Sequence, residues 1–199
     1  MVGRLTVITG PMASGKTLEL IRILSRREIK GANKILFKHN VDVRDGNNKS
    51  VSRIGIFSEA VMVKSSKDLR KKYTDFKTES NKRIVVGIEE AQFFDDNLFE
   101  EVRGILDEGV DVYLTCLNQD FRGDPFGFRD KKKLIPNILS IADDLKFLTA
   151  VCLVCGNDAT KTQRLAEGKI TRASEPLVLV GGNERYEPRC ADCWIKPDE

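Results

Sequence analysis

Short apolar runs alternate with amphipathic stretches along roughly the first 150 residues of the chain. Strands are predicted at 5–9, 34–38, 83–88 and 110–117, and helices at 17–30, 67–77 and 96–107. In the first helix Leu20, Ile21 and Leu24 recur at helical spacing, and Gly31 ends the pattern. Such alternation predicts an α/β fold, in which helices cover a mostly parallel sheet.

Two polar stretches, 40–52 and 118–133, lack a clear period and are long for plain connections. Loops of that kind are usually functional or mobile. After about residue 150 the helical period ends, and paired cysteines, turn residues and short β-rich pieces such as PLVLV (176–180) follow. We therefore predict an α/β domain over 1–150 and a small second subdomain over 151–199.

Composition supports a folded chain, because 41% of the 199 residues are hydrophobic, enough for one core of ordinary size. The 33 basic and 30 acidic side chains leave a net charge of +3, too small an excess to indicate nucleic acid as a partner. No apolar run approaches the roughly 20 residues of a membrane-spanning helix, and the N-terminus turns glycine-rich too early for a secretory signal. We therefore expect a cytoplasmic protein with no membrane partner.

A phosphate-binding loop is predicted between the first strand and the first helix, where GPMASGKT fits the pattern G-x-x-x-x-G-K-[ST]. Its glycines let backbone amides point at a polyphosphate, Lys16 reaches the terminal phosphates, and Thr17 ligates magnesium. A chance glycine turn is the alternative, which the strand-loop-helix context disfavours. The predicted ATP-binding residues are Gly10, Pro11, Met12, Ala13, Ser14, Gly15, Lys16 and Thr17.

Two adjacent acids, Glu89 and Glu90, directly follow the predicted strand 83–88. Consecutive residues of an extended chain point to opposite sides, so the pair can divide two tasks. One acid would help to hold magnesium, and the other would face the nucleophile as general base. A solvated acidic pair at a strand end is the alternative.

Four of the five cysteines form two CxxC pairs, Cys152 with Cys155 and Cys190 with Cys193. Four thiolates predict a closed, tetrahedral structural zinc site that ties together a subdomain with little core. Two redox pairs, or a fortuitous arrangement of the cysteines, are the alternatives. The fifth cysteine, Cys116, has apolar neighbours and is predicted to be a buried small hydrophobe, and we assign no role to His39, the only histidine.

Taken together, these motifs resemble those of the type II, zinc-containing thymidine kinases. The motifs, besides GPMASGKT, are Asp42-Val43-Arg44, SRIG (52–55), EEAQFF (89–94), DFRGDPF (120–126), AVCLVC (150–155), TQRL (162–165) and VGGNERYEPRC (180–190). The resemblance implies transfer of the γ-phosphate of ATP to the 5′-hydroxyl of thymidine, giving thymidine monophosphate in nucleotide salvage. It also implies a homo-oligomer, either a dimer or a tetramer.

The resemblance further implies roles for individual residues. Glu90 matches the catalytic base, Lys16 and Arg53 would serve the phosphates, and Mg²⁺ would lie at Thr17 and Glu89. A lasso-like loop of the zinc subdomain would close over the base. The residues implied at the nucleoside are Met12, Phe94, Leu117, Phe121, Phe126, Thr162, Leu177, Val178, Leu179, Val180, Gly181 and Tyr186.

This chain departs from the family in two places. The family usually has Asp-Glu where this chain has Glu89-Glu90, and the longer arm can weaken a magnesium site because Mg²⁺ tolerates little distortion. The stretch 166–176 has no clear match. Three other functions stay open: a deoxynucleoside kinase of different base preference, a nucleic-acid-stimulated ATPase, and a nucleotide-binding protein without catalysis.

Overall fold

The computed structural model describes residues 1–41, 49–52, 55–127, 135–177 and 184–198. A six-stranded parallel sheet forms its centre, in the order β5-β2-β6-β7-β1-β8. Its strands are β1 (Leu5–Thr9), β2 (Asn33–His39), β5 (Val61–Val63), β6 (Ile84–Glu89), β7 (Asp111–Cys116) and β8 (Asp144–Phe147). Every residue of β1, β6 and β7 is buried, as expected for strands covered on both faces. The predicted α/β class is therefore confirmed.

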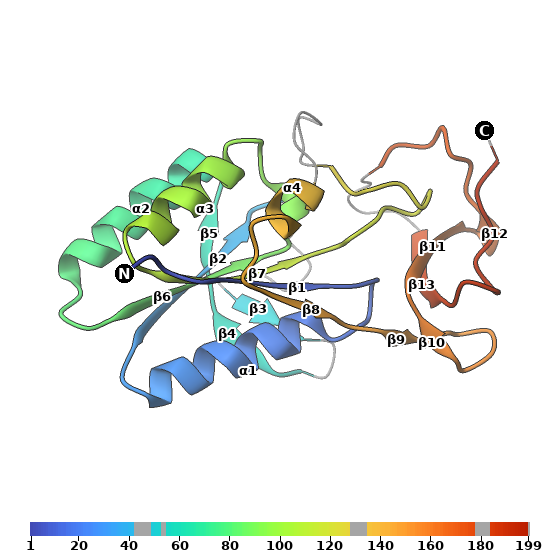
Figure 1. Ribbon diagram of the computed structural model, residues 1–199. Helices are drawn as coiled ribbons and strands as arrows, with labels where there is room; N and C mark the ends of the chain where they lie inside the picture. The colour runs from blue at the N-terminus through green and yellow to red at the C-terminus, as the bar shows by residue number, and fades with distance from the viewer. Residues whose placement is uncertain (42–48, 53–54, 128–134, 178–183, 199) are drawn as a thin grey trace.

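Helices cover both faces of the sheet. Helix α1 (Lys16–Ile29) lies on one face, while α2 (Ser66–Glu79) and α3 (Leu98–Asp107) lie together on the other (Figure 1). The buried side of α1 includes Leu20, Ile21 and Leu24, the three residues that predicted the helix. Gly87 of β6 allows this packing, because a Cβ there would lie 2.7 Å from Leu24 Cδ1.

Several short elements were not predicted. Strand β5 is apolar but has only three residues, and in β8 three of the four residues are exposed. A hairpin of β3 (Lys49–Val51) and β4 (Phe57–Glu59) begins inside the stretch read as a loop. The helical turns η1 (Ala91–Phe93) and α4 (Ile135–Leu139) are too short to show a period.

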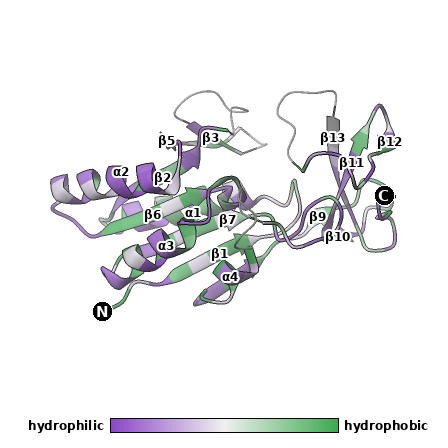
Figure 2. Ribbon diagram, turned by 90° about the horizontal axis from the view of Figure 1, so that it is seen from above, coloured by the Kyte–Doolittle hydropathy of each residue, from purple (hydrophilic) through white to green (hydrophobic). Residues whose placement is uncertain are grey.

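The C-terminal region forms small antiparallel sheets at the end of the central sheet where β1 and β7 terminate (Figures 1 and 2). Its strands are β9 (Ala150–Val151), β10 (Asp158–Ala159), β11 (Lys161–Ala166), β12 (Lys169–Ile170) and β13 (Glu184–Arg189). The change of character near residue 150 thus coincides with a change from parallel to antiparallel pairing. The division into domains at Val151 stays a prediction.

The predicted β-rich piece PLVLV is not a strand where it is described, since Pro176 and Leu177 lie outside the strands. Its remaining residues, 178–180, fall outside the described ranges. The central strands β1 and β6 carry mostly hydrophobic residues (Figure 2). Among the described residues, no helix combines the length and the apolar character needed to cross a bilayer.

Candidate active site

The phosphate loop lies between β1 and α1, as its motif requires. Gly10 has φ 147°, and a Cβ there would lie 2.1 Å from the Leu148 carbonyl oxygen, so no other residue fits. Gly15 has φ 85° and precedes the first turn of α1, which no side chain caps. The helix N-terminus therefore presents its backbone amides to an anion.

Lys16 is buried at the centre of this loop, with 6% of its surface exposed. Its Nζ donates to the carbonyl oxygens of Gly10 at 3.2 Å and Pro11 at 2.6 Å. The loop thus holds an ammonium group beside the uncapped helix start. A polyphosphate at this position would meet both the positive charge and the helix dipole.

Thr17, the residue after Lys16 in α1, donates a hydrogen bond of 2.7 Å from its Oγ1 to Glu89 Oε1 at the end of β6. Glu89 is 2% exposed, and its Oε2 is a buried oxygen without a hydrogen-bond partner among the described residues. Hydroxyl and carboxylate oxygens are the hard ligands that Mg²⁺ prefers, so the donor set and the unpartnered oxygen fit this ion. The Glu89 side chain is therefore compatible with a magnesium site, although it is one methylene longer than the aspartate usual in the family.

Burial raises the pKa of the Glu89 carboxyl, and the neighbouring Glu90 charge adds to this rise. The nearby Ser50 hydroxyl opposes this rise most strongly, followed by the hydrogen bond from Thr17 and the positive charge of Lys38. Lys38 is fully buried, and its backbone lies opposite that of Glu89 in the register of β2 and β6. The sequence reading missed Lys38, although its place at the end of a predicted strand is visible in the sequence.

Glu89 and Glu90 were predicted to be consecutive residues of one extended chain. Instead, the strand ends at Glu89, because the backbone of Glu90 is left-handed, with φ 53° and ψ 56°. Its N–H donates to Thr115 Oγ1 at 3.0 Å, and Gln92 Nε2 donates to its Oε2. A non-glycine residue in this conformation is strained and persists only where neighbours hold it. Glu90 is half-buried beside the buried Glu89, so the two acids still have different surroundings.

The described residues of the predicted nucleoside pocket are linked to the main apolar cluster, to the phosphate loop or to Arg164. Phe94, Leu117 and Phe126 belong to the main apolar cluster, and Met12 and Leu177 pack against that cluster. Backbone N–H of Met12 donates to Thr162 Oγ1 at 3.1 Å, which joins the phosphate loop to β11. Phe121 and Tyr186 both lie within cation–π distance of Arg164.

Some predicted site residues fall outside the described ranges: Arg53, Val178, Leu179, Val180 and Gly181. The role of these residues stays a prediction.

Two further predictions concern single residues inside the described part. Cys116 is completely buried, as predicted, and burial raises the pKa of its thiol to about 12. His39, which received no role, is buried with its ring edge-on to Phe94 at 5.2 Å.

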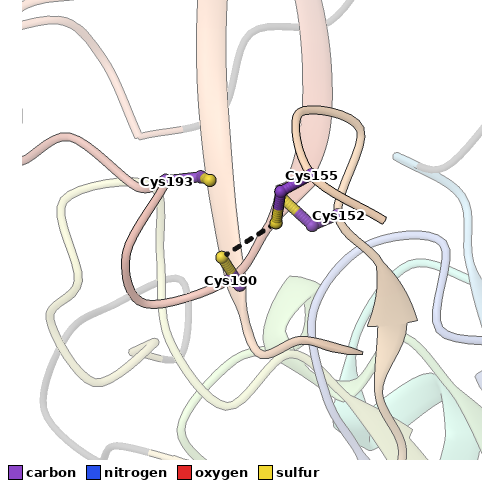
Figure 3. A group of neighbouring side chains, drawn as sticks. All are labelled: Cys152, Cys155, Cys190 and Cys193. Atoms are coloured by element: carbon purple, nitrogen blue, oxygen red, sulfur yellow. Dashed lines mark hydrogen bonds between the residues drawn. The ribbon is translucent and has the colours of Figure 1, made fainter. Parts of the chain in front are cut away.

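The four paired cysteines come together in one cluster, with their side chains directed toward one another (Figure 3). Their sulfur atoms all lie within 4.8 Å of one another, and Cys155 Sγ and Cys190 Sγ are 3.6 Å apart. Two of them follow β9 and the other two follow β13. The arrangement fits one tetrahedral site for Zn²⁺ better than two separate redox pairs.

Charge effects within the cluster agree with this reading. Burial raises the pKa of Cys152, but hydrogen bonds from surrounding backbone N–H groups outweigh it and bring the pKa to about 6. Neighbouring thiols raise the pKa of Cys193 to about 12, with Cys190 the largest influence. Thiolates packed this closely repel one another, so a divalent cation is needed to ionise all four.

A parallel sheet with a phosphate loop, a buried acid bonded to the loop threonine and a second acid beside it define a P-loop phosphotransferase. The family model for thymidine kinase matches residues 3–194, nearly the whole chain. The chain therefore belongs to the thymidine kinase family, so it is an ATP-dependent kinase that uses thymidine and ATP as substrates. Neither this match nor the described part of the structure gives evidence for a nucleic-acid-stimulated ATPase.

Proposed function

We propose that this thymidine kinase uses Glu90 as general base in the transfer of the γ-phosphate of ATP to the thymidine 5′-hydroxyl. The main support is the hydrogen bond between Thr17 and Glu89, because it joins the phosphate loop to the strand whose next residue is Glu90. In the reaction the Glu90 carboxylate accepts the hydroxyl proton, the oxygen forms a bond to the γ-phosphorus, and the bond to ADP breaks.

The phosphate loop binds the triphosphate through the amides at the start of α1 and through Lys16. Thr17 and Glu89 would hold Mg²⁺, which when bound neutralises charge on the β- and γ-phosphates. Arg53 is assigned to the phosphates by resemblance alone.

We assign the nucleoside to the apolar surroundings of Phe94, Leu117 and Phe126, together with Met12 and Thr162. Aromatic and apolar side chains accommodate a flat base, and a few polar groups set its orientation. Leu177, Tyr186 and the segment 178–181 would complete the pocket from the C-terminal side. A different base preference would follow from changed contacts within this set.

The C-terminal module, residues 151–199, is proposed to be organised by one structural Zn²⁺ on the four cysteines. Free thiols need a reducing compartment to remain zinc ligands, which favours the cytoplasm. A homo-oligomer is proposed from the family resemblance. The edge strand β8, which exposes Leu145 and Phe147, offers a surface for a second copy.

The test is phosphate transfer from γ-labelled ATP to a panel of nucleosides with Mg²⁺, beside controls without nucleoside and with single-stranded DNA. Thymidine monophosphate as the main product is expected. The role of Glu90 is tested with Glu90→Gln, which should lower kcat about a hundredfold or more while ATP binding is unchanged. Glu79→Gln, at the exposed end of α2, is the control. A Glu90→Gln enzyme with normal kcat would exclude Glu90 as the general base.

A further inference from the structure

Two arginines from different segments meet at the ring of Phe121. The guanidinium carbon of Arg122 lies 5.1 Å from the ring centroid, and that of Arg164 lies 4.8 Å from it. Phe121 is 3% exposed and Arg164 is fully buried. Cation–π attraction is strongest when the cation has lost its water, as the Arg164 guanidinium has here.

The same two guanidinium groups bind consecutive carbonyl groups of another segment. Arg122 Nη2 donates to the Glu175 carbonyl oxygen at 2.8 Å, and Arg164 Nη1 donates to the Pro176 carbonyl oxygen. Arg122 belongs to the loop after β7, and Arg164 belongs to β11. The two arginines therefore join three segments that are distant in sequence.

These bonds determine where the next residue lies. Leu177 directly follows Pro176 and packs against the main apolar cluster, which contains Phe94, Leu117 and Phe126. A buried guanidinium that loses an acceptor carries a large desolvation penalty, so Arg164 resists any movement of Pro176 away from it. The position of Leu177 thus depends on Arg164.

Arg164 also contacts an aromatic residue of β13. Tyr186 is its cross-strand partner, and the Arg164 guanidinium lies 5.9 Å from the Tyr186 ring centroid. A planar guanidinium can stack on rings and donate several hydrogen bonds in fixed directions, which a lysine ammonium cannot reproduce. Arg164 therefore connects Phe121, Tyr186 and the residue before Leu177 at once.

We propose that Arg122 and Arg164 are positioning residues that set the affinity for the nucleoside. They act through Phe121, Leu177 and Tyr186, so the proposal rests on the nucleoside pocket proposed above. Arg164 has no exposed surface with which to touch substrate, so its effect is indirect. Binding of thymidine should depend on the two arginines much more than binding of ATP or the phosphoryl transfer step.

The test compares Arg164→Met, Arg164→Lys and Arg122→Met with the unchanged enzyme in steady-state kinetics, varying thymidine and ATP separately. The expected result is a rise of the thymidine KM by about tenfold or more in Arg164→Met, as for other losses of apolar contacts in a pocket. The ATP KM and kcat should stay within about threefold, and Arg164→Lys should not restore the thymidine KM.

Arg103→Met is the matched control, because Arg103 lies 5.8 Å from the ring centroid of Phe99 on α3, on an exposed helix surface. It removes the same kind of contact and should leave the thymidine KM unchanged. Thermal unfolding and binding of a non-hydrolysable ATP analogue establish that each variant is folded. If Arg164→Met does not fold, Arg122→Met decides, since the Arg122 side chain is 25% exposed and is therefore the more easily replaced of the two arginines.

A folded Arg164→Met enzyme with an unchanged thymidine KM would overturn the proposal, and so would equal losses in the thymidine and ATP parameters. An unchanged enzyme that fails to phosphorylate thymidine would instead overturn the proposed reaction, whatever the arginine variants do. The two failures are therefore distinguishable.

Discussion

The Gln92 side chain amide joins the proposed base to the nucleoside side of the site. Its Nε2 donates to Glu90 Oε2, and its Oε1 accepts a hydrogen bond of 3.2 Å from the backbone N–H of Leu117. Gln92 is 2% exposed, so neither end is satisfied by bulk water. One buried side chain thus orients Glu90 and also binds the backbone of Leu117, a residue assigned to the nucleoside pocket.

Replacing this amide should affect catalysis more than substrate binding. Gln92→Met keeps a similar volume but removes both hydrogen bonds, so Glu90 loses its orienting donor. We expect kcat to fall about tenfold or more, within the range for misplaced acid–base groups, while the ATP KM stays unchanged. Steady-state kinetics measures both values. Gln119→Met, a half-buried glutamine of the loop after β7, is the control, and equal kcat values in the two variants would contradict the role.

Magnesium binding should weaken at acidic pH. A proton and Mg²⁺ compete for the Glu89 carboxylate, and burial raises the pKa of this group above its ordinary value of 4.5. Mg²⁺ affinity is therefore expected to fall as the pH drops through this raised pKa, at a higher pH than for an exposed glutamate. Titration of Mg²⁺ with a bound ATP analogue at several pH values measures the effect.

Glu89→Gln should weaken Mg²⁺ binding at least about tenfold and remove its pH dependence, because the amide neither titrates nor carries charge. Glu59→Gln, on the exposed side of β4, is the control. If the glutamine variant at position 89 keeps the same pH dependence, another group titrates there.

Zinc removal should disturb the nucleoside site before it unfolds the central sheet. Directly after Cys193, Trp194 donates from Nε1 to the Thr162 carbonyl oxygen at 3.2 Å, and a Cβ at Gly123 would lie 3.0 Å from its ring. Chelation is expected to change the fluorescence of this only tryptophan and to raise the thymidine KM while the helical circular dichroism is retained.

Metal analysis of reduced protein should find about one zinc per chain, as a closed four-cysteine site requires. Cys193→Ser should lower this content, whereas Cys116→Ala, far from the cluster in sequence, should keep it. Protein that contains no zinc when it is purified under reducing conditions would refute the assignment.

Glu108 should stabilise the contact between α2 and α3. Its carboxylate accepts hydrogen bonds from Arg70, from Lys77 at 2.6 Å and from the Tyr73 hydroxyl at 2.9 Å. Burial by itself would raise the pKa of Glu108. The hydrogen bonds from Lys77, Arg70 and Tyr73 outweigh this effect and lower the pKa to about 2. Its contribution is therefore fully present above about pH 4.5 and is lost as the pH falls toward 2.

Glu108→Gln should reduce the free energy of unfolding by about 1 kcal/mol at pH 7, a value kept small because the group is partly exposed. Denaturant unfolding at pH 7 and pH 3 measures the difference, which should shrink at the lower pH. Asp75→Asn, on the exposed surface of α2, is the control. A difference that does not change with pH would show that packing, rather than charge, decides the effect.

Local patterns in the sequence were enough to predict the parts whose structure depends on near neighbours. The phosphate loop needs glycine at positions of positive φ between a strand and a helix, and GPMASGKT carries that information within eight residues. The central strands β1, β6 and β7 have apolar runs because both faces are covered. The spacing of the two CxxC pairs likewise predicts a four-cysteine cluster that could hold zinc, and the structure brings these cysteines together.

Tertiary structure alone decided how these parts meet. Thr17 reaches Glu89 across 72 residues, because parallel strands that are far apart in sequence end at the same edge of the sheet. Met12 reaches Thr162 across 150 residues, because the small antiparallel sheet that contains β11 lies at that same edge. The left-handed backbone of Glu90 depends on its bonded neighbours rather than on its own preference. Arg164 looks like an ordinary surface charge in the sequence, and only folding buries it between two rings and a carbonyl group.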